Sequence, residues 1–271
     1  MLRISFIVFI SFIFFHSFVY AQPTSTIGAK SWGLGGASVS DETIFSTQNN
    51  PAAITYLQNI QAGIYSENRF MISNLGLHSV SLVIPFRWVH VGILVNHFGY
   101  SAFNQQKISL SMAKKLSSTF SLGANISYMR LNIAEQEGAG NVLIETGVYY
   151  KPQKNLTVGM LLFNPTQNKY STNAVDKIPT FARLGLRYEL NKKIQLLAES
   201  NKTLGEDLIN RFGIDYQILP SFALRCGFAN NPLYYTFGCS IKYKKTHFDF
   251  ASSVHEILGL SPHFSMSMPI N

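Results

Sequence analysis

The stretch Arg211-Phe212-Gly213-Ile214-Asp215-Tyr216-Gln217-Ile218 decides the fold class. Its large apolar residues occupy every second position and alternate with a charged residue, a polar residue or glycine. Because successive side chains of a β-strand point to opposite faces, a period of two predicts a strand with one apolar face and one polar face. The same alternation recurs at 180–190 and 233–244. The chain is therefore expected to repeat this two-faced strand many times.

A series of such runs fills the chain from residue 60 to its end. Turn residues separate most of them, as in Lys151-Pro152-Gln153-Lys154-Asn155 and Asn230-Asn231-Pro232. About fourteen runs can be identified, an even number as in single-chain bacterial outer-membrane barrels. The expected strands lie near 60–66, 78–85, 88–98, 107–115, 119–132, 141–151, 156–163, 180–190, 194–201, 209–218, 222–229, 233–244, 246–254 and 262–270. The pattern predicts an all-β, transmembrane, antiparallel up-and-down β-barrel over residues 60–271.

Composition favours a membrane barrel over a secreted β-sandwich, which would also alternate. The chain of 271 residues is 46% hydrophobic but only 13% charged, about half the charged fraction usual for a soluble domain. Many runs have the length of about 9 to 11 residues that a tilted transmembrane strand needs. Aromatic residues gather at strand ends, where membrane girdles form: Tyr149-Tyr150, Tyr188, Tyr216, Tyr234-Tyr235, Tyr243 and Trp88.

The first residues predict export. Arg3 precedes an apolar run from Ile4 to Phe15, and the small residue Ala21 follows. This order is typical of a signal peptide over residues 1–21 that is cleaved after Ala21. We therefore expect a protein of the outer membrane of a Gram-negative bacterium, with membrane lipid as its surroundings.

Residues 22–59 lack the strand period. They are rich in Gly, Ser and Asn, and only Asp41 to Ser46 is expected to form a helical turn. The run Gly33-Leu34-Gly35-Gly36 lacks the preceding strand and the Lys-Ser/Thr pair of a phosphate-binding loop. Glycine here predicts tight packing instead. We expect a short N-terminal hatch that lies inside the barrel lumen.

Two motifs in this hatch resemble a known family. They are Gly28-Ala29-Lys30-Ser31-Trp32-Gly33-Leu34-Gly35-Gly36-Ala37 and Asn50-Pro51-Ala52-Ala53. The pair resembles the FadL-like superfamily of outer-membrane barrels, and within it the PorV/PorQ proteins of the Bacteroidetes type IX secretion system. The resemblance implies a fourteen-stranded barrel with an N-terminal hatch, whose motif residues are Gly33, Gly35, Gly36, Asn50 and Pro51. The chain is short for this group, and it lacks the usual terminal aromatic residue.

Charged residues in the polar phase of the strands are the candidate functional residues. A narrow lumen requires such charges to pair with one another or with the hatch. They form a candidate polar network or pathway: Glu145, Arg183, Arg187, Glu199, Arg211, Asp215, Arg225, Lys242 and Asp249.

Other chemistries find little support in the sequence. The formal net charge is +8, but the cations are dispersed, and this predicts contact with anionic headgroups or an acidic partner and no nucleic-acid binding. The histidines lack metal-ligand spacing. His263 and Ser265 share a strand face without a nucleophile elbow, so we expect no enzyme, no metal and no cofactor. Cys226 and Cys239 lie in the apolar phase and are expected as free thiols, although a bond between them stays open.

Two functions remain. The first is a non-catalytic accessory of type IX protein secretion or surface attachment, with secretion components or secreted cargo as partners. The second is a FadL-type transporter of small hydrophobic molecules. The short loops weaken the first, the charged lumen weakens the second, and the resemblance favours the first.

Overall fold

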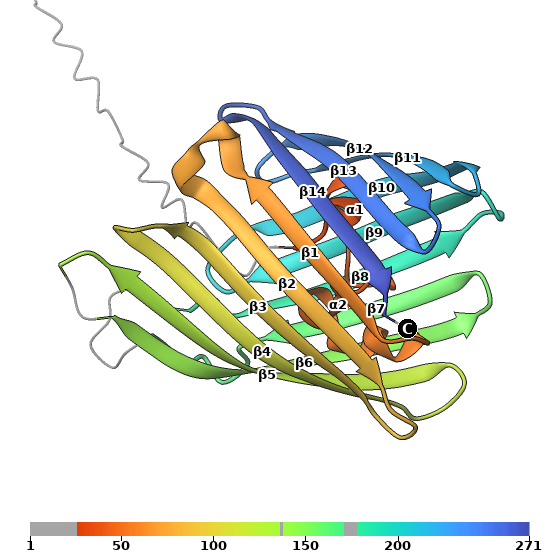
Figure 1. Ribbon diagram of the computed structural model, residues 1–271, viewed down its shortest axis with the longest axis horizontal. Coiled ribbons are helices and arrows are strands. Elements are labelled where there is room, and N and C mark those ends of the chain that lie inside the picture. Colours follow the sequence, from red (N-terminus) through yellow and green to blue (C-terminus); the bar gives the residue numbers. More distant parts are fainter. Residues whose placement is uncertain (1–25, 136–137, 171–177, 271) are drawn as a thin grey trace, which may run out of the picture.

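The chain forms a closed barrel of fourteen antiparallel strands (Figure 1). The computed structural model describes residues 26–135, 138–170 and 178–270. The predicted signal peptide, residues 1–21, lies outside the described residues. Each strand pairs with its neighbours in sequence, and β1 pairs with β14 to close the sheet. The strands are β1 (Gln61–Asn68), β2 (Gly76–Pro85), β3 (His90–Tyr100), β4 (Phe103–Lys115), β5 (Phe120–Ile133), β6 (Ala139–Gln153), β7 (Leu156–Phe163), β8 (Phe181–Glu189), β9 (Ile194–Thr203), β10 (Leu208–Leu219), β11 (Phe222–Ala229), β12 (Tyr234–Tyr243), β13 (Thr246–His255) and β14 (Gly259–Pro269).

The residues that alternate along each strand face opposite sides of the barrel wall, with most of the polar residues inward and most of the apolar residues outward. In β10, Arg211 and Asp215 are each 8% exposed, whereas Phe212 and Ile214 are 44% and 46% exposed. Arg211 pairs with Glu199 on β9, so the strand register places inward-facing residues of the two strands side by side. Because every predicted run overlaps a strand and the sheet closes, the fold class is confirmed.

The two ends of the barrel differ in the length of their connections. At one end, the strands are joined by residues 69–75, which contain η2 (Arg69–Met71) and η3 (Ser73–Leu75), and by residues 164–180. At the other end the connections are short, such as 154–155, 220–221 and 244–245. We call the latter the short-turn end. β14 finishes there, at the lower right of Figure 1.

Exposed aromatic side chains ring the barrel near both ends. Trp88, Tyr150, Tyr188, Tyr216 and Tyr243 face outward near the short-turn end, and Tyr100, Tyr128 and Tyr235 face outward toward the other end.

The assignment of Tyr149 and Tyr234 to the girdle was wrong. Both face inward and are buried, at 0% and 8% exposure. Neighbouring residues of a strand point to opposite faces, so each Tyr-Tyr pair can place only one ring in the membrane.

The N-terminal part of the described chain lies within the barrel. It contains α1 (Ala29–Gly33), α2 (Ser46–Asn49) and η1 (Pro51–Tyr56), all labelled or coloured red to orange in Figure 1. We call residues 26–57 the interior segment. Within the expected turn at Asp41 to Ser46, the Ser46 N–H donates to Thr43 O (3.0 Å), and the helix α2 begins at Ser46. α1 and η1 were not expected.

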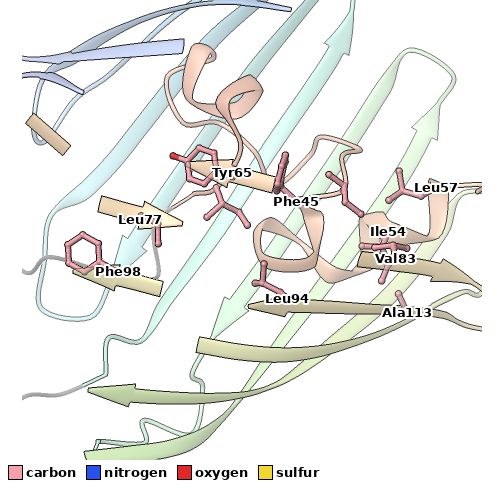
Figure 2. Close-up of a cluster of buried hydrophobic side chains, with 11 residues drawn as sticks. Phe45, Ile54, Leu57, Tyr65, Leu77, Val83, Leu94, Phe98 and Ala113 are labelled. Carbon is pink, nitrogen blue, oxygen red and sulfur yellow. The ribbon is translucent and has the colours of Figure 1, made fainter. Parts of the chain in front are cut away.

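Apolar packing fixes this segment to one side of the wall. Phe45, Ile54 and Leu57 of the segment pack with Tyr65, Leu77, Val83, Leu94 and Phe98 of β1 to β3 (Figure 2). The inward face of these strands is therefore a packed core in which the segment supplies the central side chains.

Within the described ranges, no helix has both the length and the apolar content needed to cross a bilayer.

Candidate functional site

A belt of inward-facing glycines receives the interior segment. A Cβ added to Gly227 would lie 2.3 Å from the Gly35 nitrogen, and one added to Gly213 would lie 2.6 Å from the Leu34 oxygen. Such approaches leave no room for any side chain, so only glycine permits them. The belt also includes Gly63, Gly92, Gly123, Gly147, Gly159, Gly185 and Gly238, each of which lies against an atom of the segment within 3.1 Å of an added Cβ.

The motif glycines of the segment meet this belt. Gly35 has φ +71 and Gly36 has φ +82, a left-handed conformation that favours glycine. The Gly35 N–H donates to the Thr236 hydroxyl (2.9 Å), and the Tyr234 hydroxyl donates to the Gly35 oxygen (3.1 Å). Gly33 lies opposite Gly238 of β12. The glycine run thus docks on β10 to β12 through its backbone.

Asn50 and Pro51 hold the other half of the segment. The Asn50 amide donates to Val39 O (2.7 Å) and to Val148 O on β6 (3.0 Å), and its oxygen accepts from Ala52 N (3.1 Å). Pro51 begins η1, where its missing N–H leaves no donor unpaired. This motif therefore ties two parts of the segment to each other and to the wall.

Glu199 of β9 is the centre of the first buried ionic cluster. It accepts from the backbone N–H groups of Ser38 (2.7 Å) and Val39 (2.9 Å). Arg211 forms an ion pair with it at 2.6 Å, and Arg183 lies at 4.0 Å. A single wall carboxylate thus anchors the segment backbone and is neutralised by neighbouring strands.

Arg187 of β8 forms a second cluster with acids of the segment. Its guanidinium lies 3.3 Å from both Asp41 and Glu42, and Lys30 lies 2.9 Å from Asp41. Burial raises the pKa of the Asp41 carboxyl, but the Lys30 and Arg187 cations outweigh burial and bring that pKa down to about 2. Asp41 is therefore charged at neutral pH and holds the segment to β8.

The remaining predicted charges pair mainly within the wall. Glu145 lies 2.6 Å from Lys107 on β4, and both are buried. Arg225 of β11 lies 3.1 Å from Asp215 and 3.1 Å from Asp249. Lys242 is in the same inward phase but is exposed at the short-turn end.

Sequence reasoning missed several partners in these clusters. Lys107 stands in the inward phase of β4, and the alternation of that strand could have identified it. Asp41 and Glu42 lie in an irregular segment that has no period to reveal their direction. A further buried group joins Tyr65, Glu67 and His263: the Tyr65 hydroxyl lies 2.9 Å from both the Glu67 carboxylate and His263 Nδ1. Tyr65 and Glu67 share one face of β1, and His263 of β14 joins them only because the barrel closes between these two strands.

Cys226 and Cys239 are both unbonded. Cys226 lies opposite Phe237 and Cys239 lies opposite Leu224, so the two thiols are not direct cross-strand partners. Among the residues that the structure describes, no group of three His, Cys, Asp or Glu side chains is arranged to hold a metal ion.

An apolar groove of about 770 Å³ lies along the outward face of β7 to β12. Its lining residues are mostly outward-facing: Leu156, Leu186, Tyr188, Leu196, Ala198, Phe212, Ile214, Cys226, Phe228, Tyr235 and Phe237. The inward-phase residues Leu197, Gly213 and Gly227 also line it. Behind the two glycines lies Leu34-Gly35 of the interior segment. At this position only strand backbone separates the groove from the segment.

A second hollow of about 760 Å³ opens at the short-turn end between the segment and β9 to β14. Its lining is polar and includes the cations Lys30, Arg225, Lys242, Lys244 and Lys245 and the acids Glu42, Asp215 and Asp249. This hollow is the opening of the lumen at the short-turn end, and cations outnumber acids in its lining.

Comparison with solved structures identifies proteins of similar fold. No protein-family profile and no curated protein sequence matches the chain. The toluene transporter TodX of Pseudomonas putida is similar, with a TM-score of 0.67, 12% identity, and 90% of this chain and 96% of that chain covered. A FadL homologue of Pseudomonas aeruginosa has a TM-score of 0.66 and 13% identity, with 89% and 97% covered. The Acinetobacter baumannii outer membrane protein Omp33 has a TM-score of 0.53 and 10% identity, with 78% and 98% covered. The chain therefore has the fold of the FadL-type outer-membrane barrels.

Proposed function

We propose that this protein is a non-catalytic outer-membrane channel that admits small hydrophobic molecules. The observation that carries the proposal is the apolar groove on β7 to β12, which is backed by strand glycines and the interior segment. A hydrophobic molecule dissolved in the membrane would meet an apolar concave surface there that it can occupy without contact with water. The similar fold of TodX, which is described as a toluene transporter, supports the same reading.

The location follows from the same features. An outward apolar face between two aromatic rims is what a bilayer requires of a barrel. The predicted cleaved signal peptide supplies the export step. We place the short-turn end in the periplasm, because outer-membrane barrels have short periplasmic turns and longer extracellular loops.

Uptake of radiolabelled toluene by cells that express the chain tests the proposal. Cys226→Trp would fill the groove with an apolar side chain, and Val95→Trp places the same side chain on the outward face of β3, outside the groove. We expect uptake above that of cells without the barrel, a clear loss in Cys226→Trp and none in Val95→Trp. Uptake equal to that of cells without the barrel would reject the channel function.

A role in type IX secretion is the second candidate. It is favoured by the hatch motifs and by a lumen filled with paired charges such as Glu199 with Arg211. Affinity isolation of the tagged chain from detergent-solubilised outer membranes of its host, followed by mass spectrometry, separates the two. Co-purified secretion components or cargo would support the accessory role, and a barrel that carries only lipid or hydrocarbon would support transport.

A further inference from the structure

Charge is distributed unequally between the two ends of the barrel. Every connection at the short-turn end except 220–221 carries or adjoins at least one cation: Arg87, Lys114, Lys115, Lys151, Lys154, Lys192, Lys193, Lys242, Lys244 and Lys245. All are exposed except Lys151, which is half-buried and pairs with Glu42. Among the described residues, the acids near this end are Glu42 and Glu189 together with Asp41, Asp215 and Asp249, which are buried and paired with Lys30, Arg187 or Arg225. Of the cations at these connections, Lys115, Lys151 and Lys242 stand in the inward phase of their strands, and we call the other seven cations the basic rim.

Among its described residues, the opposite end carries acids and cations in equal number. Within the described ranges it carries the acids Glu135, Glu206, Asp207 and Glu256 together with the cations Arg69, Arg130, Lys169 and Lys202. The excess of positive charge outside the buried clusters therefore lies at the short-turn end.

Cations of the basic rim lie directly beside outward aromatic rings. The Arg87 guanidinium lies 5.1 Å from the Trp88 ring centre, and the Lys244 ammonium lies 5.4 Å from that of Tyr243. Trp88 and Tyr243 are 71% and 64% exposed. Outward Trp and Tyr side chains mark the level of the lipid headgroups. The rim thus lies where phosphate groups of a surrounding leaflet would lie.

We propose that the basic rim binds the phosphate headgroups of anionic phospholipids in the leaflet that surrounds the short-turn end. The spread of the cations favours a leaflet over an acidic protein. Arg87 lies between β2 and β3, Lys192 and Lys193 lie between β8 and β9, and Lys244 and Lys245 lie between β12 and β13. These connections are distributed around the circumference, and only a surrounding layer reaches all of them at once. The inference does not depend on what the barrel transports.

Thermal unfolding of the full chain in lipid vesicles tests whether the basic rim binds anionic headgroups. The protein is folded into vesicles of phosphatidylcholine alone or of phosphatidylcholine mixed with phosphatidylglycerol, at low and at high salt. We expect phosphatidylglycerol to raise the unfolding temperature by about 5 °C or more at low salt. High salt should remove most of that gain, because mobile ions screen exposed charges.

Matched variants localise the effect. K192Q/K193Q/K245Q removes three cations from the basic rim, and R130Q/K169Q/K202Q removes three from the other end. The rim variant should lose about half or more of the phosphatidylglycerol gain while it unfolds at the wild-type temperature in phosphatidylcholine. The control variant should keep the gain.

Three results would overturn the proposal. One is a wild-type protein with the same unfolding temperature in both lipids. The second is an equal loss of the gain in both variants, which would place the effect on net charge alone. The third is an equal gain in phosphatidylcholine from inorganic phosphate or from a polyglutamate peptide, which would assign the rim to a free phosphate or to an acidic protein.

Discussion

Gly159 illustrates how close the interior segment comes to the wall. A Cβ at this position would lie 2.1 Å from the Val39 oxygen and 2.5 Å from the Val39 carbonyl carbon. Both are backbone atoms, and Val39 is itself held by Glu199. The contact therefore cannot relax by a simple side-chain rotation, and the same reasoning applies to Gly123, which faces the Ala52 backbone.

We expect Gly159→Ala to destabilise the folded barrel by about 1–3 kcal/mol, as overpacking does in a close-packed interior. Gly76→Ala is the matched control, because its added Cβ would meet the His78 side chain at 3.2 Å and no backbone atom closer than 3.8 Å. Urea unfolding in vesicles measures both. Equal stability of the two variants would show that the segment does not press against the wall.

Asp41 gives the interior segment a dependence on pH. Its pKa of about 2 lies below its ordinary value of 3.8. A depressed pKa in the folded state means that the carboxylate stabilises the fold above about pH 4 and that this contribution is lost as pH falls toward 2. The difference corresponds to about 2 kcal/mol.

Proteolysis of the segment across this pH range provides the measurement, with an acid-stable protease. Wild type should become more susceptible between pH 4 and pH 2, whereas Asp41→Asn should be susceptible already at neutral pH and change little on acidification. A variant with the wild-type acid response would refute the role of the Asp41 ion pairs.

At the scale of the strand, the effect of a substitution on membrane assembly depends on whether the side chain faces the lipid or the lumen. Phe237 lies on the outward face of β12 and is 61% exposed, whereas Lys242 lies in the inward phase at the strand end. The two residues differ in face and in depth. They are therefore expected to differ in the environment that a charge would meet.

Phe237→Arg should impair membrane assembly by about 2–4 kcal/mol, because the guanidinium would face hydrocarbon. Lys242→Ala should change assembly little. The heat-dependent gel mobility of barrels refolded into vesicles reports the folded fraction. Equal folding of the two variants would contradict the assignment of faces.

Strand positions were predictable because each strand carries its own alternation. The runs at 222–229 and 156–163 coincide with β11 and β7. Tyr149 was misassigned because its identity, an aromatic residue near a strand end, suggests the membrane rim, whereas its phase on β6 and its hydrogen bond to Ser40 O (3.1 Å) place it inside. The position of a residue in the alternation of its strand therefore predicts the direction of its side chain better than the residue type does.

For the whole molecule, the unequal ends predict its orientation in the membrane. Residues 204–207 connect β9 and β10 at the end with the longer connections, and residues 190–193 lie at the short-turn end. A short epitope inserted after Gly205 should bind antibody on intact cells, and one inserted after Lys192 should bind only after the outer membrane is permeabilised. The reverse pattern would invert the orientation and place the basic rim at the cell surface.

The sequence by itself determined the class of the fold, the strands and most of the inward-facing charges, because the period of two is a local property of each strand. It also marked Gly33, Gly35 and Gly36 as packing positions, and the family resemblance marked Asn50 and Pro51 as hatch residues. Only the tertiary structure decided which residues meet. Gly35 lies against Gly227, Glu199 binds Ser38 and Val39, and Tyr65 lies beside His263. These pairs are distant in sequence and depend on closure of the barrel around an aperiodic segment, and local patterning carries no information about either.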